Sequence, residues 1–205
     1  MKPNVYDFLL RLYVGADELR KSMTKPSLCG DVVCATDAHT LIMIDPAKCG
    51  LPYREVEKYP NIQQVIPQKG ASRMIHLADM VSELAKFRME YPSLDGQEEC
   101  DSCDGHGETH CEHCGHDEPC EDCQGVGYFD LRYEELKKNR GSHRRIKIGE
   151  RNIGIRYALQ LADTMAYLGV SECTLLNSDA ENNKALFFQI TPDVQTLIMP
   201  IVEPF

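Results

Sequence analysis

Apolar residues recur at three- and four-residue spacing in two stretches, the pattern of one buried helix face. Residues 76–90 and 155–168 are therefore predicted to be helices. A shorter helix is predicted over residues 5–14, with Asn4 as its N-terminal cap. The apolar positions of the two longer helices are Leu77, Met80, Val81, Leu84 and Phe87 in the first, and Tyr157, Ala158, Leu161, Met165 and Leu168 in the second.

Short apolar runs between turn residues predict strands. Residues 45–70 separate two groups of them and, with four prolines, are predicted to be irregular. Helices mixed with short strands indicate an α+β fold rather than alternating α/β units. The predicted strands are 28–29, 32–36, 40–44, 146–148, 152–153, 172–176, 185–190 and 196–201.

A polar insertion interrupts this pattern. Residues 95–124 hold six of the ten cysteines and eleven Asp and Glu, but no Lys or Arg. The cysteines form three Cys-x-x-Cys pairs, which supply two sulfur ligands to one metal from a single turn. Such a cluster favours zinc over disulfides in the cytoplasmic protein that we expect from the absence of a signal peptide and of a long apolar run.

Two of the three pairs match each other and predict one zinc ion bound by four thiolates: Cys100, Cys103, Cys120 and Cys123. Glycines that follow each pair free backbone amides to hydrogen-bond the sulfurs. The middle pair departs from this pattern, and a second zinc site is left open. Its candidate ligands are Cys111, Cys114, His110 and His116.

Charge is unevenly distributed along the chain. The net charge is −10, yet residues 132–156 carry nine Lys and Arg against three Glu. This basic stretch is either a solvated loop or a surface that contacts phosphates. The candidate DNA-binding residues are Lys137, Lys138, Arg140, Arg144, Arg145, Lys147 and Arg151.

Two known families share motifs with this chain. The cysteine pairs with their trailing glycines resemble the DnaJ-type zinc finger, which has four repeats rather than three. Three other segments, in order, resemble the bacterial DNA polymerase III β-subunit, or sliding clamp. They are Val33–Leu41 (VCATDAHTL), Tyr59–Pro67 (YPNIQQVIP) and the closing Thr196–Ile201 (TLIMPI).

The clamp resemblance implies a discontinuous clamp-like domain, 1–94 and 129–205, of two βαβββ-type halves, interrupted by a zinc-binding module at 95–128. It also implies that the helices carrying Arg11 and Arg156 face DNA. Clamps of that family carry three such domains per chain, whereas this chain has the length of one. A closed ring would therefore need about six copies, and the oligomeric state stays open.

The function implied is that of a non-enzymatic, clamp-like protein in DNA replication or DNA-bound complexes. Its zinc lobe would be an interaction surface for replication proteins. The alternative is an adaptor that keeps the clamp fold, does not encircle DNA, and binds proteins through its acidic finger. Asp37 and His39 could form a catalytic pair, but no nucleophile accompanies them, and a turn-capping role for Asp37 is favoured.

Overall fold

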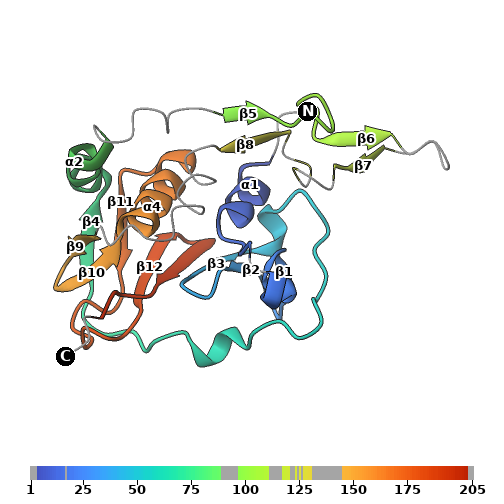
Figure 1. Cartoon of the computed structure of the whole chain (residues 1–205). Coiled ribbons are helices and arrows are strands. Elements are labelled where there is room, and N and C mark those ends of the chain that lie inside the picture. Colours follow the sequence, from blue (N-terminus) through green and yellow to red (C-terminus); the bar gives the residue numbers. More distant parts are fainter. Residues whose placement is uncertain are drawn as a thin grey trace.

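An antiparallel sheet of seven strands organises the described part of the molecule (Figure 1). The structure is a computed structural model that describes residues 4–16, 18–88, 97–110, 117–120, 123, 125, 127–130 and 145–202. Along the sheet the order is β1-β2-β3-β13-β12-β11-β4. The strands are β1 Ser27–Cys29, β2 Val32–Thr36, β3 Thr40–Ile44, β4 Arg73–His76, β11 Glu172–Leu175, β12 Leu186–Thr191 and β13 Val194–Ile198.

The α-helices among the described residues are α1 Val5–Leu12, α2 Leu77–Arg88 and α4 Ile155–Tyr167. Short 3-10 helices lie at Glu18–Met23, Pro46–Lys48 and Ile62–Gln64. Asn4 caps α1 as predicted, because its side chain accepts a hydrogen bond from the Tyr6 amide. Gly169 follows α4 with a positive φ of 68°, which glycine adopts without steric cost.

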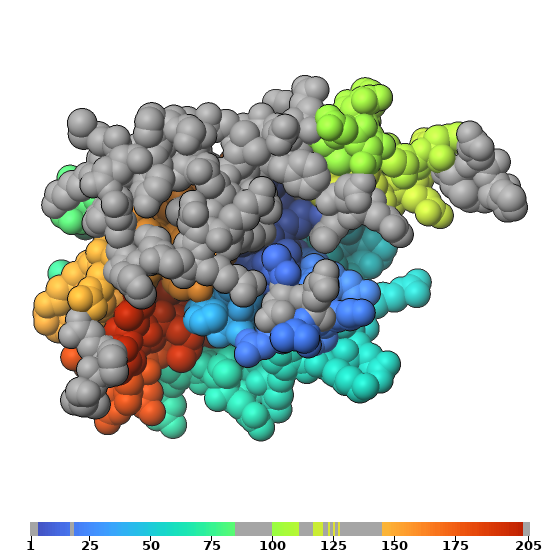
Figure 2. Space-filling model, viewed as in Figure 1, coloured from blue at the N-terminus to red at the C-terminus, as the bar shows by residue number. Residues whose placement is uncertain are grey.

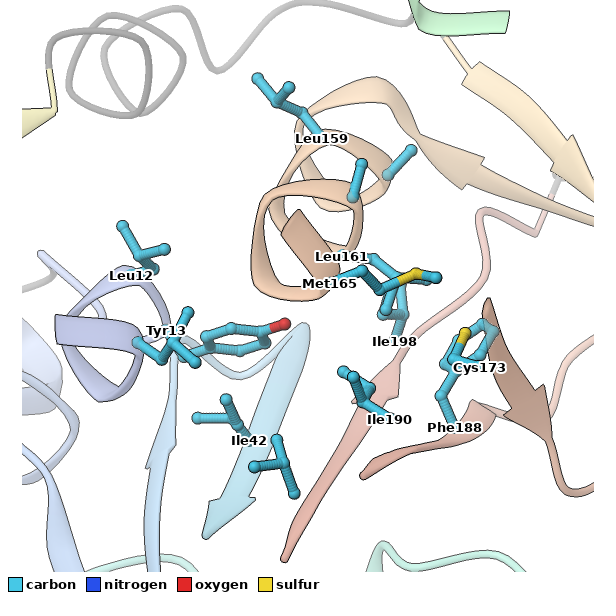
Figure 3. Close-up of a cluster of buried hydrophobic side chains, with 14 of the residues drawn as sticks. Leu12, Tyr13, Ile42, Leu159, Leu161, Met165, Cys173, Phe188, Ile190 and Ile198 are labelled. Carbon is cyan, nitrogen blue, oxygen red and sulfur yellow. The ribbon is translucent and has the colours of Figure 1, made fainter. Parts of the chain in front are cut away.

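The main core lies between the helices and one face of the sheet, and Figure 3 shows part of it. Every residue of β3 is buried, since this strand lies between β2 and β13 in the middle of the sheet. Its side chains alternate: Ile42 and Ile44 join the main core, whereas Leu41 and Met43 face a second cluster. Ile62 and Tyr59, from the irregular segment, cover that second face.

The chain is divided into two similar halves. The order α1-β1-β2-β3 in the first half is repeated as α4-β11-β12-β13 in the second. Antiparallel pairing of β3 with β13 joins them, with Thr196 opposite Ile42. The α+β architecture expected from the pattern is thus present, with the long insertion between the halves.

Several elements differ from the pattern-based expectations. Val81 was expected on the buried face of α2 but is 45% exposed, while Met80 and Leu84 are buried. The edge strand β4 was not expected, because its residues are mostly exposed and lack an apolar alternation. The last strand ends at Ile198 rather than at residue 201.

In the described part of the insertion, short two-stranded sheets lie apart from the main sheet. β5 (Gln97–Glu99) pairs with β8 (Tyr128–Asp130), which brings the two ends of the insertion together. β6 (Glu108–His110) pairs with β7 (Asp117–Pro119), and this hairpin extends away from the rest of the molecule (Figures 1 and 2). A further hairpin, β9 (Arg145–Ile148) with β10 (Arg151–Gly154), leads into α4.

Candidate metal centre

Four cysteine sulfurs converge inside the insertion. The Sγ atoms of Cys100, Cys103, Cys120 and Cys123 all lie within 4.8 Å of one another. Cys100 and Cys120 are 3.8 Å apart, and Cys103 and Cys123 are 3.6 Å apart. Tetrahedral zinc with Zn–S bonds of about 2.3 Å places its sulfur ligands roughly 3.8 Å apart. The spacing therefore fits one tetrahedral metal ion, and these four cysteines are the ones named from the sequence as candidate ligands.

The four cysteines are buried although the segment around them is polar. Their exposed fractions are 1%, 7%, 1% and 4% in chain order, and they form a cluster separate from the main core. A cluster of four thiols is too small to be a hydrophobic core. A metal ion held by the four sulfurs would supply stability that the described residues of the insertion do not gain from an apolar core.

Backbone amides support the sulfurs in two equivalent ways. The Gly107 amide donates to Cys103 Sγ and the Gly127 amide to Cys123 Sγ, both at 3.2 Å. The two turns also exchange backbone hydrogen bonds: the Cys100 amide donates to the Gly127 carbonyl, and the Cys120 amide to the Gly107 carbonyl, both at 2.9 Å. Amide donors at thiolates are the expected outer shell of a structural zinc site.

Burial raises the pKa of the Cys103 thiol to about 12, although the Gly107 amide opposes the shift. The pKa of Cys123 is also raised by burial. A bound cation would oppose this rise in pKa, because it binds the thiolate form of the cysteines directly. Metal binding must then release protons, so metal affinity should strengthen as the pH rises.

Arg11 connects the candidate metal centre to the main domain, which consists of the seven-stranded sheet and the helices packed on it. From the last turn of α1, its Nη1 atom donates a 2.7 Å hydrogen bond to the Cys123 carbonyl. Burial lowers the pKa of the Arg11 guanidinium, and nearby Tyr53 opposes that shift. The clamp resemblance implied that the helix carrying Arg11 faces DNA, but this side chain contacts the cysteine module instead. No local sequence signal marks a contact between residues so distant in the chain.

The candidate ligands of a second metal are largely outside the described residues. Cys111, Cys114 and His116 belong to that undescribed part of the chain. His110 lies on β6, and its Nδ1 atom is 3.0 Å from the Asp117 carboxylate across the hairpin. Both side chains are exposed. A second zinc site stays a prediction.

The candidate DNA-binding residues are only partly described. Lys137, Lys138, Arg140 and Arg144 lie outside the described residues. Arg145 and Lys147 are exposed on β9, and Lys147 forms an ion pair of 2.9 Å with Glu150.

Arg151 requires a correction, because it is 2% exposed and cannot present its charge to phosphates. Its guanidinium donates to the backbone carbonyls of Asn177, Lys184 and Ala185. Its role is to hold the 177–185 loop against β10.

The turn between β2 and β3 is held by Asp37, as expected from its sequence. Asp37 Oδ1 accepts hydrogen bonds from the His39 and Thr40 amides, and Oδ2 accepts one from Arg156 on α4. Arg156 lies over the ring of Tyr157, with which His39 stacks. Because the contacts of Asp37 with the described residues hold the turn and α4, the geometry supports capping rather than catalysis.

Comparison with known proteins rests on structure alone, since no protein family and no curated protein matches the sequence. The chain superposes on sliding clamps, also called DNA polymerase III subunit beta. The Bartonella birtlesii clamp bound to griselimycin has 13% identity and a TM-score of 0.52 over 97% of this chain and 64% of that chain. The Bacillus subtilis clamp gives 13% identity and 0.52 over 98% and 62%.

A Helicobacter pylori clamp bound to a DNA ligase peptide gives 12% identity and 0.52 over 97% and 63%. The fold is that of a sliding clamp. This chain spans less than two thirds of the length of these clamps. None of the helices in the described part of the chain has the length and hydrophobicity needed to span a lipid bilayer.

Proposed function

We propose that this chain is a non-enzymatic, sliding-clamp-like protein that works in DNA replication or on other DNA-bound complexes in the cytoplasm. The observation that carries the proposal is the fold likeness to clamps, which extends over 97–98% of the chain. In this proposal residues 1–94 and 129–205 form the clamp-like domain, and residues 95–128 form a zinc-binding module of the DnaJ type.

Zinc is the proposed ion at the four-cysteine centre. Four thiolates at tetrahedral spacing, with amide donors at two of them, suit a closed structural zinc site rather than a catalytic one with an open position. The ion would provide much of the folding free energy of the module.

The module is also proposed to be an interaction lobe. Its hairpin of β6 and β7 extends from the molecule and is strongly acidic in sequence (Figure 2). Like charges oppose contact between this lobe and phosphates. A replication protein with a basic docking surface is therefore the partner that its charge favours.

The DNA contact proposed here involves the basic stretch, with Arg145 and Lys147 exposed on β9. The adaptor alternative has the same fold but no DNA contact, and the charge of the acidic lobe favours it. DNA affinity measured at several salt concentrations separates the two, because affinity that depends on phosphate contacts falls steeply as salt rises.

The experiment compares the full zinc-loaded chain with the double variant Arg144→Glu/Arg145→Glu. Weaker DNA binding by the variant, with a smaller salt dependence, supports the clamp-like function. The control Lys69→Glu changes an exposed charge outside the basic stretch and should bind as the parent does. If the parent chain does not bind DNA even at low salt, the clamp-like function is contradicted and the adaptor alternative is supported.

Light scattering of the zinc-loaded protein tests ring formation. A particle of about six copies would support a closed ring around DNA. A monomer or dimer would contradict the ring and direct attention to protein partners of the acidic lobe.

A further inference from the structure

The sulfurs of Cys29 and Cys34 lie in contact in the hairpin formed by β1 and β2. Both cysteines are far in sequence from the four-cysteine centre. Cys29 ends β1 and Cys34 lies within β2, on either side of the tight turn at Gly30 and Asp31. Their Sγ atoms are 2.6 Å apart. Neither cysteine belongs to the candidate metal centre or to any role proposed above.

The strand register explains this contact. Cys29 pairs with Val32, and Cys34 pairs with Ser27, so the two cysteines are diagonal neighbours on one face of the hairpin. Cys34 Sγ also lies 3.4 Å from the Ser27 carbonyl, to which its thiol donates. Both belong to the cluster on the face of the sheet opposite the helices. The hairpin itself thus holds the two sulfurs together.

The sulfur spacing distinguishes the two sets of cysteines. In the candidate metal centre the sulfurs are 3.6 and 3.8 Å apart, which leaves room for an ion between them. The 2.6 Å between Cys29 and Cys34 leaves no such room. It is within about 0.6 Å of the roughly 2.05 Å length of a disulfide bond.

The two thiols differ in access. Cys34 is fully buried, whereas Cys29 is partly exposed on β1, an edge strand of the sheet. An external oxidant can therefore reach Cys29 but not Cys34.

We propose that Cys29 and Cys34 are a reversible thiol–disulfide pair, a covalent modification site in which Cys29 reacts first and Cys34 resolves. The co-reactant is a small disulfide of the glutathione class. Such a pair needs one sulfur that the oxidant can reach and a second sulfur close to the first, and Cys29 and Cys34 meet both requirements.

The chemistry proceeds in two exchanges. The Cys29 thiolate attacks glutathione disulfide, forms a mixed disulfide and releases one glutathione thiolate. Cys34 then loses its proton to solvent, and its sulfur attacks the Cys29 sulfur of the mixed disulfide and releases the second glutathione. Overall, two protein thiols are oxidised to one disulfide, while glutathione disulfide is reduced to two glutathione molecules.

The second exchange should be the slower one. Burial raises the pKa of the Cys34 thiol well above its usual value, and the neighbouring Cys29 adds to the shift. Little thiolate is then available to resolve the mixed disulfide. The intermediate at Cys29 should accumulate long enough to be trapped.

Peptide mapping tests this directly, since trypsin places both cysteines in one peptide, residues 22–48, with no other cysteine. The zinc-loaded full chain is incubated with glutathione disulfide, its free thiols are alkylated, and the protein is then digested. We expect this peptide to appear without alkyl groups and lighter by two hydrogen atoms. The six module cysteines fall in a different peptide, 89–132, and do not interfere.

Variants assign the order of the two steps. Cys34→Ser should retain glutathione on Cys29, whereas Cys29→Ser should leave Cys34 unmodified and free to be alkylated once the protein is unfolded. Cys49, half-buried and without a sulfur partner among the described residues, lies in the next tryptic peptide and should be alkylated throughout. Alkylation of both Cys29 and Cys34 in the parent after this treatment would overturn the proposal and leave the pair as packing only.

Discussion

At the residue scale, Ala38 occupies a backbone conformation that suits glycine. Its φ is 75°, in the left-handed region, where a Cβ atom is disfavoured. The turn holds it there because the Ala38 amide donates to Thr36 Oγ1 while Asp37 accepts from the next two amides.

We therefore expect Ala38→Gly to stabilise the protein. Relief of the left-handed strain should stabilise the fold by about 1–2 kcal/mol. The extra conformational freedom of glycine in the unfolded chain offsets about 0.5–1 kcal/mol of that gain. A net gain of up to about 1.5 kcal/mol should appear in urea unfolding. Ala47→Gly, in an exposed 3-10 turn with no positive φ, is the control and should destabilise; equal effects of the two changes would contradict the argument.

Arg151 shows that a residue within a basic stretch can be structural. Its guanidinium is buried and bonded to three backbone carbonyls around the 177–185 loop. Removal would leave those carbonyls without their charged donor.

Arg151→Met should destabilise the fold by about 2–4 kcal/mol, because hydrogen bonds to charged groups are worth about 1.5–3 kcal/mol and buried acceptors would lose their partner. Thermal and urea unfolding measure the effect. Lys147→Met, four positions earlier with an exposed ion pair, should change stability by less than about 1 kcal/mol. If both variants unfold like the parent, the buried role of Arg151 is wrong.

At the element scale, the two cysteine turns are built on close backbone contact. A Cβ at Gly107 would lie 2.4 Å from the Gly125 carbonyl oxygen, and one at Gly127 would lie 2.2 Å from the Gly105 carbonyl oxygen. Both glycines also have positive φ, at 78° and 88°. Each turn therefore requires glycine for its own shape and for its packing on the other turn.

Gly127→Ala should weaken zinc binding, because the clash displaces the amide that supports Cys123 Sγ. Loss of such an outer contact costs about 10- to 100-fold in metal affinity, which competition with a chromophoric chelator can measure. The matched control is Gly169→Ala, which has a positive φ of 68° but no atom within 4 Å of the added Cβ. The control should lose stability yet retain its zinc affinity, and a similar affinity loss in both would exclude the local explanation.

At the scale of the whole molecule, the module and the main domain have separate sources of stability. The main core extends from α1 through the sheet to α2 and α4, whereas the buried cluster among the described residues of the module consists of its four cysteines. A hydrogen bond from Arg11 to the Cys123 carbonyl joins the two. Loss of the metal should therefore affect one part and spare the other.

Cys100→Ser should abolish zinc binding and make the module sensitive to protease, while the main domain retains its cooperative unfolding. Circular dichroism during heating and limited proteolysis measure the two effects separately. Cys49→Ser removes a thiol outside the module and should retain both zinc and protease resistance. Collapse of the whole chain in Cys100→Ser would show that the insertion is integral to the core.

The sequence by itself determined most of the helices and strands, and it named the four cysteines that the fold brings together. Asn4, Gly169 and the apolar spacing of α4 act over a few residues, and local chemistry is sufficient to predict them. The same holds for the cysteine turns, since sulfur spacing and trailing glycines are properties of a short segment. The exposure of Val81 and the presence of the edge strand β4 were not predicted, because exposure on a helix or at a sheet edge depends on which other elements lie nearby.

Only the tertiary structure decided the contacts between distant residues. Arg11 lies against Cys123, Arg156 reaches Asp37, and Arg151 is buried beside a loop that begins at Asn177. A long cationic side chain has the same sequence signature whether it binds a backbone carbonyl, a carboxylate or a phosphate. Burial selects among these partners, and burial is set by how the sheet and helices pack rather than by the residues next in the chain.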